Sequence, residues 1–360
     1  MKIKGYHLDY YLLLTTVILL ILGILFLSSV SAVFSQERFG KPWYYLFHQT
    51  LYGIIPGIIL GFVAFRIDLS KIKKRSFLII LGALILMVLV FIPGLSVISG
   101  GAPRWLNLRF ASFQPSEFLK LAFIVYLSTL LGSRKISLMP FFVIIGVITV
   151  LLTCQSDIST LGTIISTAII MYFLASTPFW HIALITLLTS GVFLVLIKLA
   201  PYRMKRLQVL LGLIKDPMGL GYQIKQILIA IGSGGIFGAG LTESYQKFGF
   251  IPQTISDSIF AIIAEETGFI GSLFLISLFM IFLWRGFTIS KKTADKSLQL
   301  LAVGISSWIS IQALINIGAM VGILPLTGIP LPFISYGGSH LVAELIGVGI
   351  LLNISRSVKK

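Results

Sequence analysis

A short acidic stretch, Ser256-Asp-Ser-Ile-Phe-Ala-Ile-Ile-Ala-Glu-Glu266, is the part of the chain best suited to chemistry. It holds three carboxylates, although the 360-residue chain has only 12 Asp and Glu. The stretch leads into an apolar run. A charged side chain within a membrane costs about 2.5–3.5 kcal/mol, so such residues usually belong to a site or a buried pair. A second interpretation places Asp257, Glu265 and Glu266 in water at a helix start, where negative charge suits the helix dipole.

The composition indicates what kind of protein surrounds this stretch. The chain is 57% hydrophobic and 11% charged, whereas roughly 25% of the residues in a soluble domain are charged. Apolar runs close to the ~20 residues that span a bilayer recur along the sequence. We therefore predict an all-α polytopic membrane protein that forms one domain over residues 1–360. Ten transmembrane spans are expected, at residues 9–33, 44–65, 76–94, 115–132, 139–155, 159–176, 180–198, 257–284, 298–320 and 337–354.

Two local features need separate interpretation, the first span and the single cysteine. Lys2 and Lys4 precede the first span, and Val30-Ser-Ala32 resembles a signal-peptide cleavage site. The apolar core of this span is longer than the roughly 7–15 residues of a signal peptide, which favours an uncleaved anchor. Cys154 is the single cysteine, which excludes an internal disulfide and a cysteine-based zinc site.

The net charge of +16 points to a membrane rather than to nucleic acid. Basic residues cluster between the apolar spans, as from Arg66 to Arg75, which is typical of orientation signals and lipid-headgroup contacts. The short connections on the same side of the membrane as the N-terminus contain more Lys and Arg than those on the opposite side. Both termini are therefore expected in the cytoplasm. Residues 101–117, 155–160, 199–257 and 325–339 then all lie at the outer face.

The longest connection, residues 199–256 between the seventh and eighth spans, is expected to be an ordered extracellular loop. Within it, Ile224, Ile227, Leu228 and Ile231 follow helical spacing, which predicts a short helix lying in the membrane interface. The glycine-rich run at residues 232–240 allows close backbone contacts. Because this run lacks the lysine of a phosphate loop and does not follow a strand, its nucleotide-binding signal is weak.

Seven motifs, in order along the chain, resemble the SEDS family (shape, elongation, division and sporulation), which includes FtsW, RodA and SpoVE. The motifs are Gly101-Ala-Pro-Arg-Trp105, Phe113-Gln-Pro-Ser-Glu-Phe-Leu-Lys120, Gln155-Ser-Asp157 with Thr160, Gly221-Tyr-Gln223, Ala230-Ile-Gly-Ser-Gly-Gly-Ile-Phe-Gly238, Asp257-Ser-Ile-Phe-Ala-Ile-Ile-Ala-Glu-Glu266 and Leu324-Pro-Leu-Thr-Gly-Ile-Pro-Leu-Pro-Phe-Ile-Ser-Tyr-Gly-Gly-Ser339. Gly221-Tyr-Gln223 and Ser244-Tyr-Gln-Lys247 look more like the division and sporulation branch than the elongation branch.

This resemblance implies a function. Members of the family are peptidoglycan glycosyltransferases that polymerise lipid II on the outer face of the bacterial cytoplasmic membrane, together with a class B penicillin-binding protein. Asp257 occupies the position of the family's essential aspartate. The chain departs from the family pattern at Ser156, Ser159, Gln253 and His340, which leaves the surroundings of Asp257 less certain than Asp257 itself.

The implied reaction requires a base for the acceptor hydroxyl and charge compensation for the departing lipid pyrophosphate. Asp257 is the candidate catalytic residue, because a carboxylate in a low-dielectric cleft can have a raised pKa that suits proton transfer. A pyrophosphate leaves without a proton, so the two-carboxylate arrangement of glycosidases is not needed. Asp257 could instead bind a divalent cation, Mg²⁺ or Mn²⁺, that neutralises the pyrophosphate. The sequence does not separate these roles.

Basic and polar residues of the same motifs are candidates for binding substrate. Arg offers a planar fork that matches phosphate oxygens, while Lys is a compact point charge. For Arg203 to Arg206, contact with lipid headgroups is an equally good interpretation. The candidate substrate-binding residues are Arg104, Glu117, Lys120, Gln155, Asp157, Arg203, Lys205, Arg206, Ser335 and Ser339.

Three of these candidates have structural alternatives. Glu117 and Lys120 stand three residues apart on one predicted helix and can pair, so we favour a structural pair supporting the floor of the cavity. Asp157 either caps the helix of the sixth span or belongs to the cavity wall, as the family motif suggests.

Three other functions compete with the polymerase. A lipid II flippase would need polar residues throughout the membrane thickness, but the inner halves of the predicted spans are largely apolar. A non-catalytic scaffold for the transpeptidase would not need Asp257. An O-antigen polymerase or ligase would share the architecture but not the Gln-Pro-Ser-Glu and Pro-Leu-Pro-Phe motifs.

Overall fold

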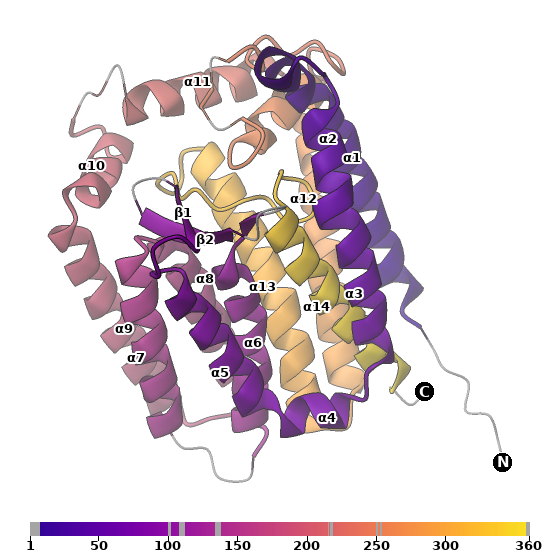
Figure 1. Ribbon diagram of the computed structural model, residues 1–360, viewed down its shortest axis with the longest axis vertical. Coiled ribbons are helices and arrows are strands. Elements are labelled where there is room, and N and C mark those ends of the chain that lie inside the picture. The colour runs from indigo at the N-terminus through magenta and orange to yellow at the C-terminus, as the bar shows by residue number, and fades with distance from the viewer. Residues whose placement is uncertain are drawn as a thin grey trace.

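The computed structural model describes residues 8–99, 102–107, 112–133, 138–214, 216, 219–249, 251–252 and 254–357. Most of the chain forms helices that run side by side (Figure 1). The helices are α1 (Tyr10–Phe39), α2 (Tyr44–Gln49), the π-helical turn η1 (Thr50–Ile54), α3 (Ile55–Arg66), α4 (Leu69–Lys74), α5 (Ser76–Leu89), α6 (Pro115–Leu131), α7 (Leu138–Cys154), α8 (Ile158–Leu174), α9 (Phe179–Leu199), α10 (Pro201–Leu210), α11 (Leu220–Ser233), α12 (Ile259–Lys292), α13 (Lys296–Met320) and α14 (Gly338–Arg356).

Each predicted span corresponds to helical structure. Among the described residues, six segments are long and apolar enough to cross a membrane: α1, the continuous stretch from α2 to α3, α9, α12, α13 and α14. Helices α5, α7 and α8 are apolar but shorter, and α6 carries the fourth predicted span. The all-α polytopic membrane fold is therefore confirmed.

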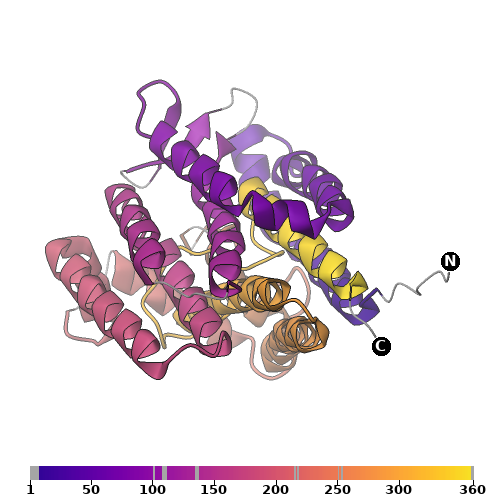
Figure 2. The same ribbon diagram turned by 90° about the horizontal axis from the view of Figure 1, so that it is seen from below.

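Helices α13 and α14 form the centre of the bundle. Helix α13 packs against α6, α8 and α12, while α14 packs along α3. Seen from below, α14 lies beside the N-terminal helices, and the helices of residues 138–199 form the opposite side (Figure 2). Helix α9 lies at the edge, with Leu187 and Leu194 exposed, which is expected of a surface that faces lipid.

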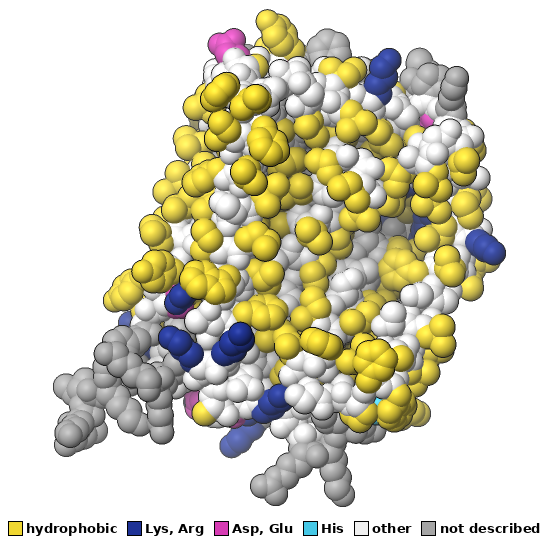
Figure 3. Space-filling view, turned by 180° about the vertical axis from the view of Figure 1, so that it is seen from behind, with side chains coloured by type: hydrophobic (Ala, Val, Ile, Leu, Met, Phe, Trp, Pro, Cys, Tyr) yellow, Lys and Arg dark blue, Asp and Glu magenta, His cyan; other side chains and the backbone are white. Residues whose placement is uncertain are grey.

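The two ends of the bundle differ in character. Helix α1 begins and α14 ends at the end where α4 lies, whereas α10 and α11 lie at the other end (Figure 1). From behind, hydrophobic side chains cover most of the visible face, and Lys and Arg gather towards the end with α4 (Figure 3). The start of α1 and the end of α14 thus lie at the opposite end of the bundle from α10 and α11.

Two parts of the fold differ from the prediction. The connection before α6 forms a small antiparallel sheet of β1 (Ser96–Ser99), β2 (Ala102–Asn107) and β3 (Ser112–Phe113), in the order β1-β2-β3. The eighth span was predicted as one helix from residue 257. Instead α12 starts at Ile259 and has a non-helical residue, Gly268, with φ 67° and ψ −163°.

The described residues of the long connection between α9 and α12 include two helices, α10 and α11. Helix α11 covers the expected interfacial segment, and Ile227 is buried, but Leu228 and Ile229 are exposed. Helix α10 was not predicted. A groove of about 590 Å³ lies between α10 and α11 and is lined by apolar side chains together with Asp216 and Lys225.

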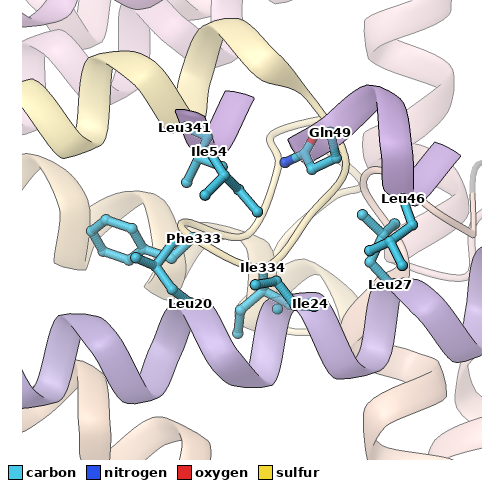
Figure 4. A pocket seen from close by; sticks show the side chains of 10 residues that line it. Leu20, Ile24, Leu27, Leu46, Gln49, Ile54, Phe333, Ile334 and Leu341 are labelled. Carbon is cyan, nitrogen blue, oxygen red and sulfur yellow. The ribbon is translucent and has the colours of Figure 1, made fainter. Parts of the chain in front are cut away.

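The segment between α13 and α14 crosses the bundle as an irregular loop, and apolar packing holds it in place. Phe333 and Ile334 of this loop face Leu20, Ile24 and Leu27 of α1 around a pocket of about 10 Å³ (Figure 4). A volume of this size holds about one water molecule. The loop is therefore packed against α1 at Phe333 and Ile334.

Candidate active site

Asp257 lies at the end of the long connection, two residues before α12 begins. Its side chain is half-buried. The backbone around it is tied to the α13–α14 loop, because the Ser335 hydroxyl donates to the Ser256 carbonyl and the Tyr336 amide donates to the Ile255 carbonyl at 2.9 Å. The carboxylate is thus presented from a fixed backbone rather than from a free loop.

The α13–α14 loop approaches the carboxylate at a glycine. Gly328 has a φ of +72°, and a Cβ atom at this position would lie 3.3 Å from Asp257 Oδ2. Glycine therefore suits both the left-handed backbone and the space beside the carboxylate. The neighbouring Thr327 carbonyl accepts a hydrogen bond of 2.7 Å from Ser159 on α8, which joins this wall to the α7–α8 turn.

Charged side chains from three elements act on Asp257. The pKa of the Asp257 carboxyl is raised to about 6, chiefly by burial and to a smaller extent by the negative charge of Asp157. A hydrogen bond with Ser256 and the positive charges of Arg206 and Arg104 oppose this rise in pKa. The result is a carboxylate that can exchange a proton near neutral pH, which suits a general base.

Arg104, on β2, connects the sheet to the α7–α8 turn. Its Nε donates to the Gln155 carbonyl at 2.9 Å, and its Nη2 donates to the Ser156 carbonyl at 2.8 Å. The planar guanidinium fork suits two neighbouring acceptors. Arg104 is therefore held in place while its charge still acts on Asp257.

Asp157 takes the capping role, one of the two roles predicted for it. It is the N-cap of α8, since its carboxylate accepts hydrogen bonds from the Thr160 amide at 3.2 Å and from the Thr160 hydroxyl at 2.8 Å. It is also close enough to Asp257 to raise the pKa of that carboxyl. The cap interpretation is confirmed, and the cap lies at the site.

The three basic residues of α10 point in different directions. Arg206 donates to the Leu326 carbonyl of the α13–α14 loop and acts on Asp257. Arg203 donates to the Leu196 carbonyl on α9 at 2.9 Å. Lys205 forms an ion pair with Asp216 at 3.0 Å and is half-exposed. Only Arg206 is thus connected to the site through contacts of the described residues.

Glu117 and Lys120 form the predicted ion pair, with Nζ and Oε2 2.8 Å apart and both side chains 3% exposed. Lys120 also donates to Gln312 Oε1 at 2.7 Å and lies over the Trp308 ring. Gln312 donates to Glu344 Oε1 at 3.4 Å. This network is buried between α6, α13 and α14. The Glu117–Lys120 pair is therefore located where it can support the α13–α14 loop.

Three further candidates are occupied by structural hydrogen bonds. The Gln155 side chain is buried and donates to the Met87 carbonyl at 3.2 Å. The Ser335 hydroxyl accepts from the Leu331 amide at 2.8 Å, and the Ser339 hydroxyl accepts from the Gln114 amide at 3.0 Å. Each of these side chains shapes the backbone around the site.

Glu265 and Glu266 lie near the break in α12 rather than at a helix start. Each is 2% exposed. Glu265 accepts hydrogen bonds from the Ser244 hydroxyl and from the Tyr245 amide at 3.1 Å. Glu266 pairs with Lys247 at 3.6 Å. The solvated interpretation is therefore wrong for both, because they fasten the long connection to α12.

Sequence comparison places this arrangement among known proteins. A sequence profile of the FtsW/RodA/SpoVE family, described as "Cell cycle protein", matches residues 10–360. The chain belongs to this family. It is 39% identical over 355 residues to stage V sporulation protein E of Bacillus subtilis, with 97% of each chain covered. It is 35% identical over 365 residues to a probable peptidoglycan glycosyltransferase FtsW of Geobacter sp. strain M18, with 99% of each covered.

Solved structures share the fold of this FtsW/RodA/SpoVE protein. A chain from a peptidoglycan synthase complex, solved in a study of coordinated polymerisation and crosslinking, superposes with a TM-score of 0.78 at 24% identity and covers 98% of both chains. The rod shape determining protein RodA of Thermus thermophilus superposes with a TM-score of 0.71 at 23% identity, again covering 98% of both. The membrane fold is thus shared over nearly the whole length.

Two amide side chains of α13, Gln312 and Asn316, were missed as parts of the site of this FtsW/RodA/SpoVE protein. They stand four residues apart inside the predicted ninth span, so they lie on one face of the helix. Uncharged polar pairs at this spacing inside a span are a signal that sequence reasoning could have used, because buried polar groups need partners.

The structure also bears on the predicted divalent cation. Among the described residues, no group of three or more His, Cys, Asp or Glu side chains is arranged to hold a metal ion. Mg²⁺ commonly uses one or two carboxylates together with substrate phosphates. Asp257, with Asp157 nearby, fits that smaller donor set.

Proposed function

We propose that this protein is a peptidoglycan glycosyltransferase that polymerises lipid II, with Asp257 as the catalytic residue. Family membership supports the class of activity, since curated relatives along the full length carry the name peptidoglycan glycosyltransferase FtsW. The observation that carries the catalytic assignment is the half-buried Asp257 carboxyl, whose pKa is raised to about 6 by burial although the charges of Arg206 and Arg104 oppose this rise.

In the proposed reaction, Asp257 accepts the proton of the acceptor sugar hydroxyl as that oxygen attacks the anomeric carbon of the donor. The bond between this carbon and the lipid pyrophosphate breaks, and the pyrophosphate leaves with the bonding electrons. Arg206 and Arg104 stabilise the negative charge that develops there. In the alternative role of Asp257, this carboxylate would hold a divalent cation, Mg²⁺ or Mn²⁺, and the cation would supply charge neutralisation for the pyrophosphate.

The other candidate residues take supporting roles in this proposal. Arg206, Arg104 and Asp157 border the substrate, while Arg203 and Lys205 stay outside it, held by the Leu196 carbonyl and by Asp216. Glu117, Lys120, Gln155, Ser335 and Ser339 hold the walls.

We further propose that the site faces outward and both termini face the cytoplasm, because the Lys and Arg residues gather at the end of the bundle where the chain begins and ends. The partner is a class B penicillin-binding protein. The similarity in fold to a chain from a peptidoglycan synthase complex supports this assembly.

The test uses the full chain, co-purified with its transpeptidase, and fluorescent lipid II as substrate. The parent should give glycan ladders on a gel, and Asp257→Asn should lower polymerisation by about 10²–10⁴-fold, as expected for loss of a general base. Glu243→Gln is the matched control, because Glu243 is an exposed carboxylate of the same connection. Near-normal ladders from Asp257→Asn would remove Asp257 from the mechanism. Lipid movement across vesicles without ladders would favour a flippase.

A further inference from the structure

Asn316 on α13 makes two hydrogen bonds that meet at the candidate site. Its Nδ2 donates to the Asp257 carbonyl at 2.8 Å and to the Ile329 carbonyl at 2.7 Å. The side chain is 1% exposed. Because backbone carbonyls only accept hydrogen bonds, the amide group must face both with its nitrogen, which fixes the orientation of the side chain.

These two carbonyls belong to the segments on either side of the catalytic carboxylate. Asp257 precedes α12, and Ile329 follows Gly328, whose backbone borders the carboxylate. In the described structure, Asn316 therefore joins the backbone that carries the carboxylate to the loop that forms its wall.

The neighbouring turn of α13 strengthens this connection. Gln312 donates to the Pro330 carbonyl at 3.2 Å, so two amides one turn apart hold two successive carbonyls of the loop. Gln312 in turn accepts from Lys120 at 2.7 Å and from Trp308 at 3.1 Å. The connection is thus anchored in the buried centre of the bundle.

We infer that Asn316 is a positioning residue for the reaction, which holds the Asp257 backbone and residues 329–330 at a fixed separation. The inference rests on the proposed function of Asp257. It predicts an effect on turnover rather than on substrate binding, because Asn316 is buried and reaches the site only through backbone carbonyls.

The first variant is Asn316→Leu, which keeps a similar size but removes both donors. A misplacement of about 1 Å at a reacting group can lower the rate by about 10²-fold, so kcat should fall at least tenfold while KM changes less than twofold. The acid limb of the pH profile should also move, because a displaced carboxyl has a different degree of burial and hence a different pKa. Asn316→Ser, which retains one donor, should give an intermediate kcat.

The chain offers a matched control at the other end of the bundle. Asn353 on α14 donates through Nδ2 to the Ala64 carbonyl at 3.0 Å and to the Ile67 carbonyl at 2.6 Å. Asn353→Leu removes the same pair of hydrogen bonds far from Asp257. It should lower Tm while leaving kcat within about twofold and the acid limb within about 0.2 pH units of the parent values, which is the usual error of such assays.

Three outcomes decide the inference when Asp257→Asn is measured in parallel. The inference is supported if Asp257→Asn is inactive and if, of the two asparagine variants, only Asn316→Leu has a lower kcat and a shifted acid limb. The positioning role is overturned, and the proposed function stands, if Asp257→Asn is inactive but Asn316→Leu behaves like Asn353→Leu. The same holds if the kcat of Asn316→Leu falls only in proportion to its Tm and its acid limb does not move. An active Asp257→Asn overturns both. If Asn316→Leu does not insert, Asn316→Ser is judged by the same criteria.

Discussion

Opposing influences on a single carboxyl decide how Asp257 can react. Burial raises the pKa of this group, while the positive charges of Arg206 and Arg104 lower it. As a general base Asp257 must be deprotonated, so kcat/KM should increase as the pH rises through about 6. The same shift affects stability in the opposite sense. The folded pKa lies above the ordinary value of 3.8, so stability falls as the pH rises between these values.

Removing one of the neighbouring charges should move this pH dependence. Arg206→Gln removes a positive charge that favours the carboxylate, so the pKa of Asp257 should increase and the acid limb should shift to higher pH. Lys205→Gln is the control on the same helix, because Lys205 pairs with Asp216 and is half-exposed. The measurement is kcat/KM for lipid II polymerisation between about pH 5 and pH 8, the range that brackets ordinary histidine and raised carboxyl pKa values. Equal shifts for both variants would contradict the local role of Arg206.

The buried pair of Glu117 and Lys120 leads to a second prediction at this scale. Glu117→Gln alone leaves Lys120 charged and poorly solvated, and breaking a buried pair in this way costs about 3–5 kcal/mol. Its Tm should fall together with its activity. The double variant Glu117→Gln, Lys120→Gln should recover most of the Tm, because replacing both charges is often nearly neutral.

Activity of the double variant separates the remaining roles of the pair. If the pair only supports the loop through Gln312, activity returns with Tm. A stable but inactive double variant would show that Lys120 also acts on the substrate. A Glu117→Gln variant with unchanged Tm and lost polymerisation would make Glu117 a second catalytic carboxylate.

At the scale of elements, the break in α12 is produced by two glycines that pack against each other. Gly268 has a φ of 67°, and a Cβ atom there would collide with the backbone nitrogen of Gly238. The Gly238 backbone is equally close, because a Cβ atom on it would collide with the Glu266 carbonyl. The amides of Phe269 and Ile270 donate to the Gly235 and Ile236 carbonyls at 2.9 and 3.2 Å.

Gly268→Ala should therefore destabilise the protein for two reasons, a strained left-handed backbone and a clash with Gly238. Gly235→Ala is the matched control, since Gly235 also has a positive φ of +54° but nothing lies within 4 Å of its Cβ position. The control should lose about 1–2 kcal/mol, the backbone strain alone, and Gly268→Ala distinctly more. Thermal unfolding in detergent measures both, and equal losses would show that the close packing is unimportant.

At the scale of the whole molecule, the candidate site lies at the opposite end of the bundle from the start of α1 and the end of α14. In a Cys154→Ser background, cysteines at the exposed positions Lys41 and Tyr245 should react with an impermeant thiol reagent added to intact cells. Cysteines at Lys74 and Lys291, exposed at the opposite end, should react only after the membrane is opened. Labelling of Lys74→Cys in intact cells would reverse the proposed orientation and place Asp257 in the cytoplasm.

The sequence alone determined the class of the protein, the helical segments and the family, and it singled out Asp257 as the candidate catalytic residue. These depend on local information, because an apolar run long enough to cross a bilayer indicates a span whatever its neighbours are. The ion pair of Glu117 and Lys120 and the cap at Asp157 were also predictable, since both act over three residues.

Only the tertiary structure decided which residues meet around Asp257 and what holds it there. Asn316 reaches Asp257 across 59 positions, and Arg206 reaches Leu326 across 120. The buried state of Glu265 and Glu266 and the break at Gly268 likewise depend on residues 234–247 folding back over α12. Contacts of this kind follow from how helices pack, which no local pattern of apolar and polar residues specifies.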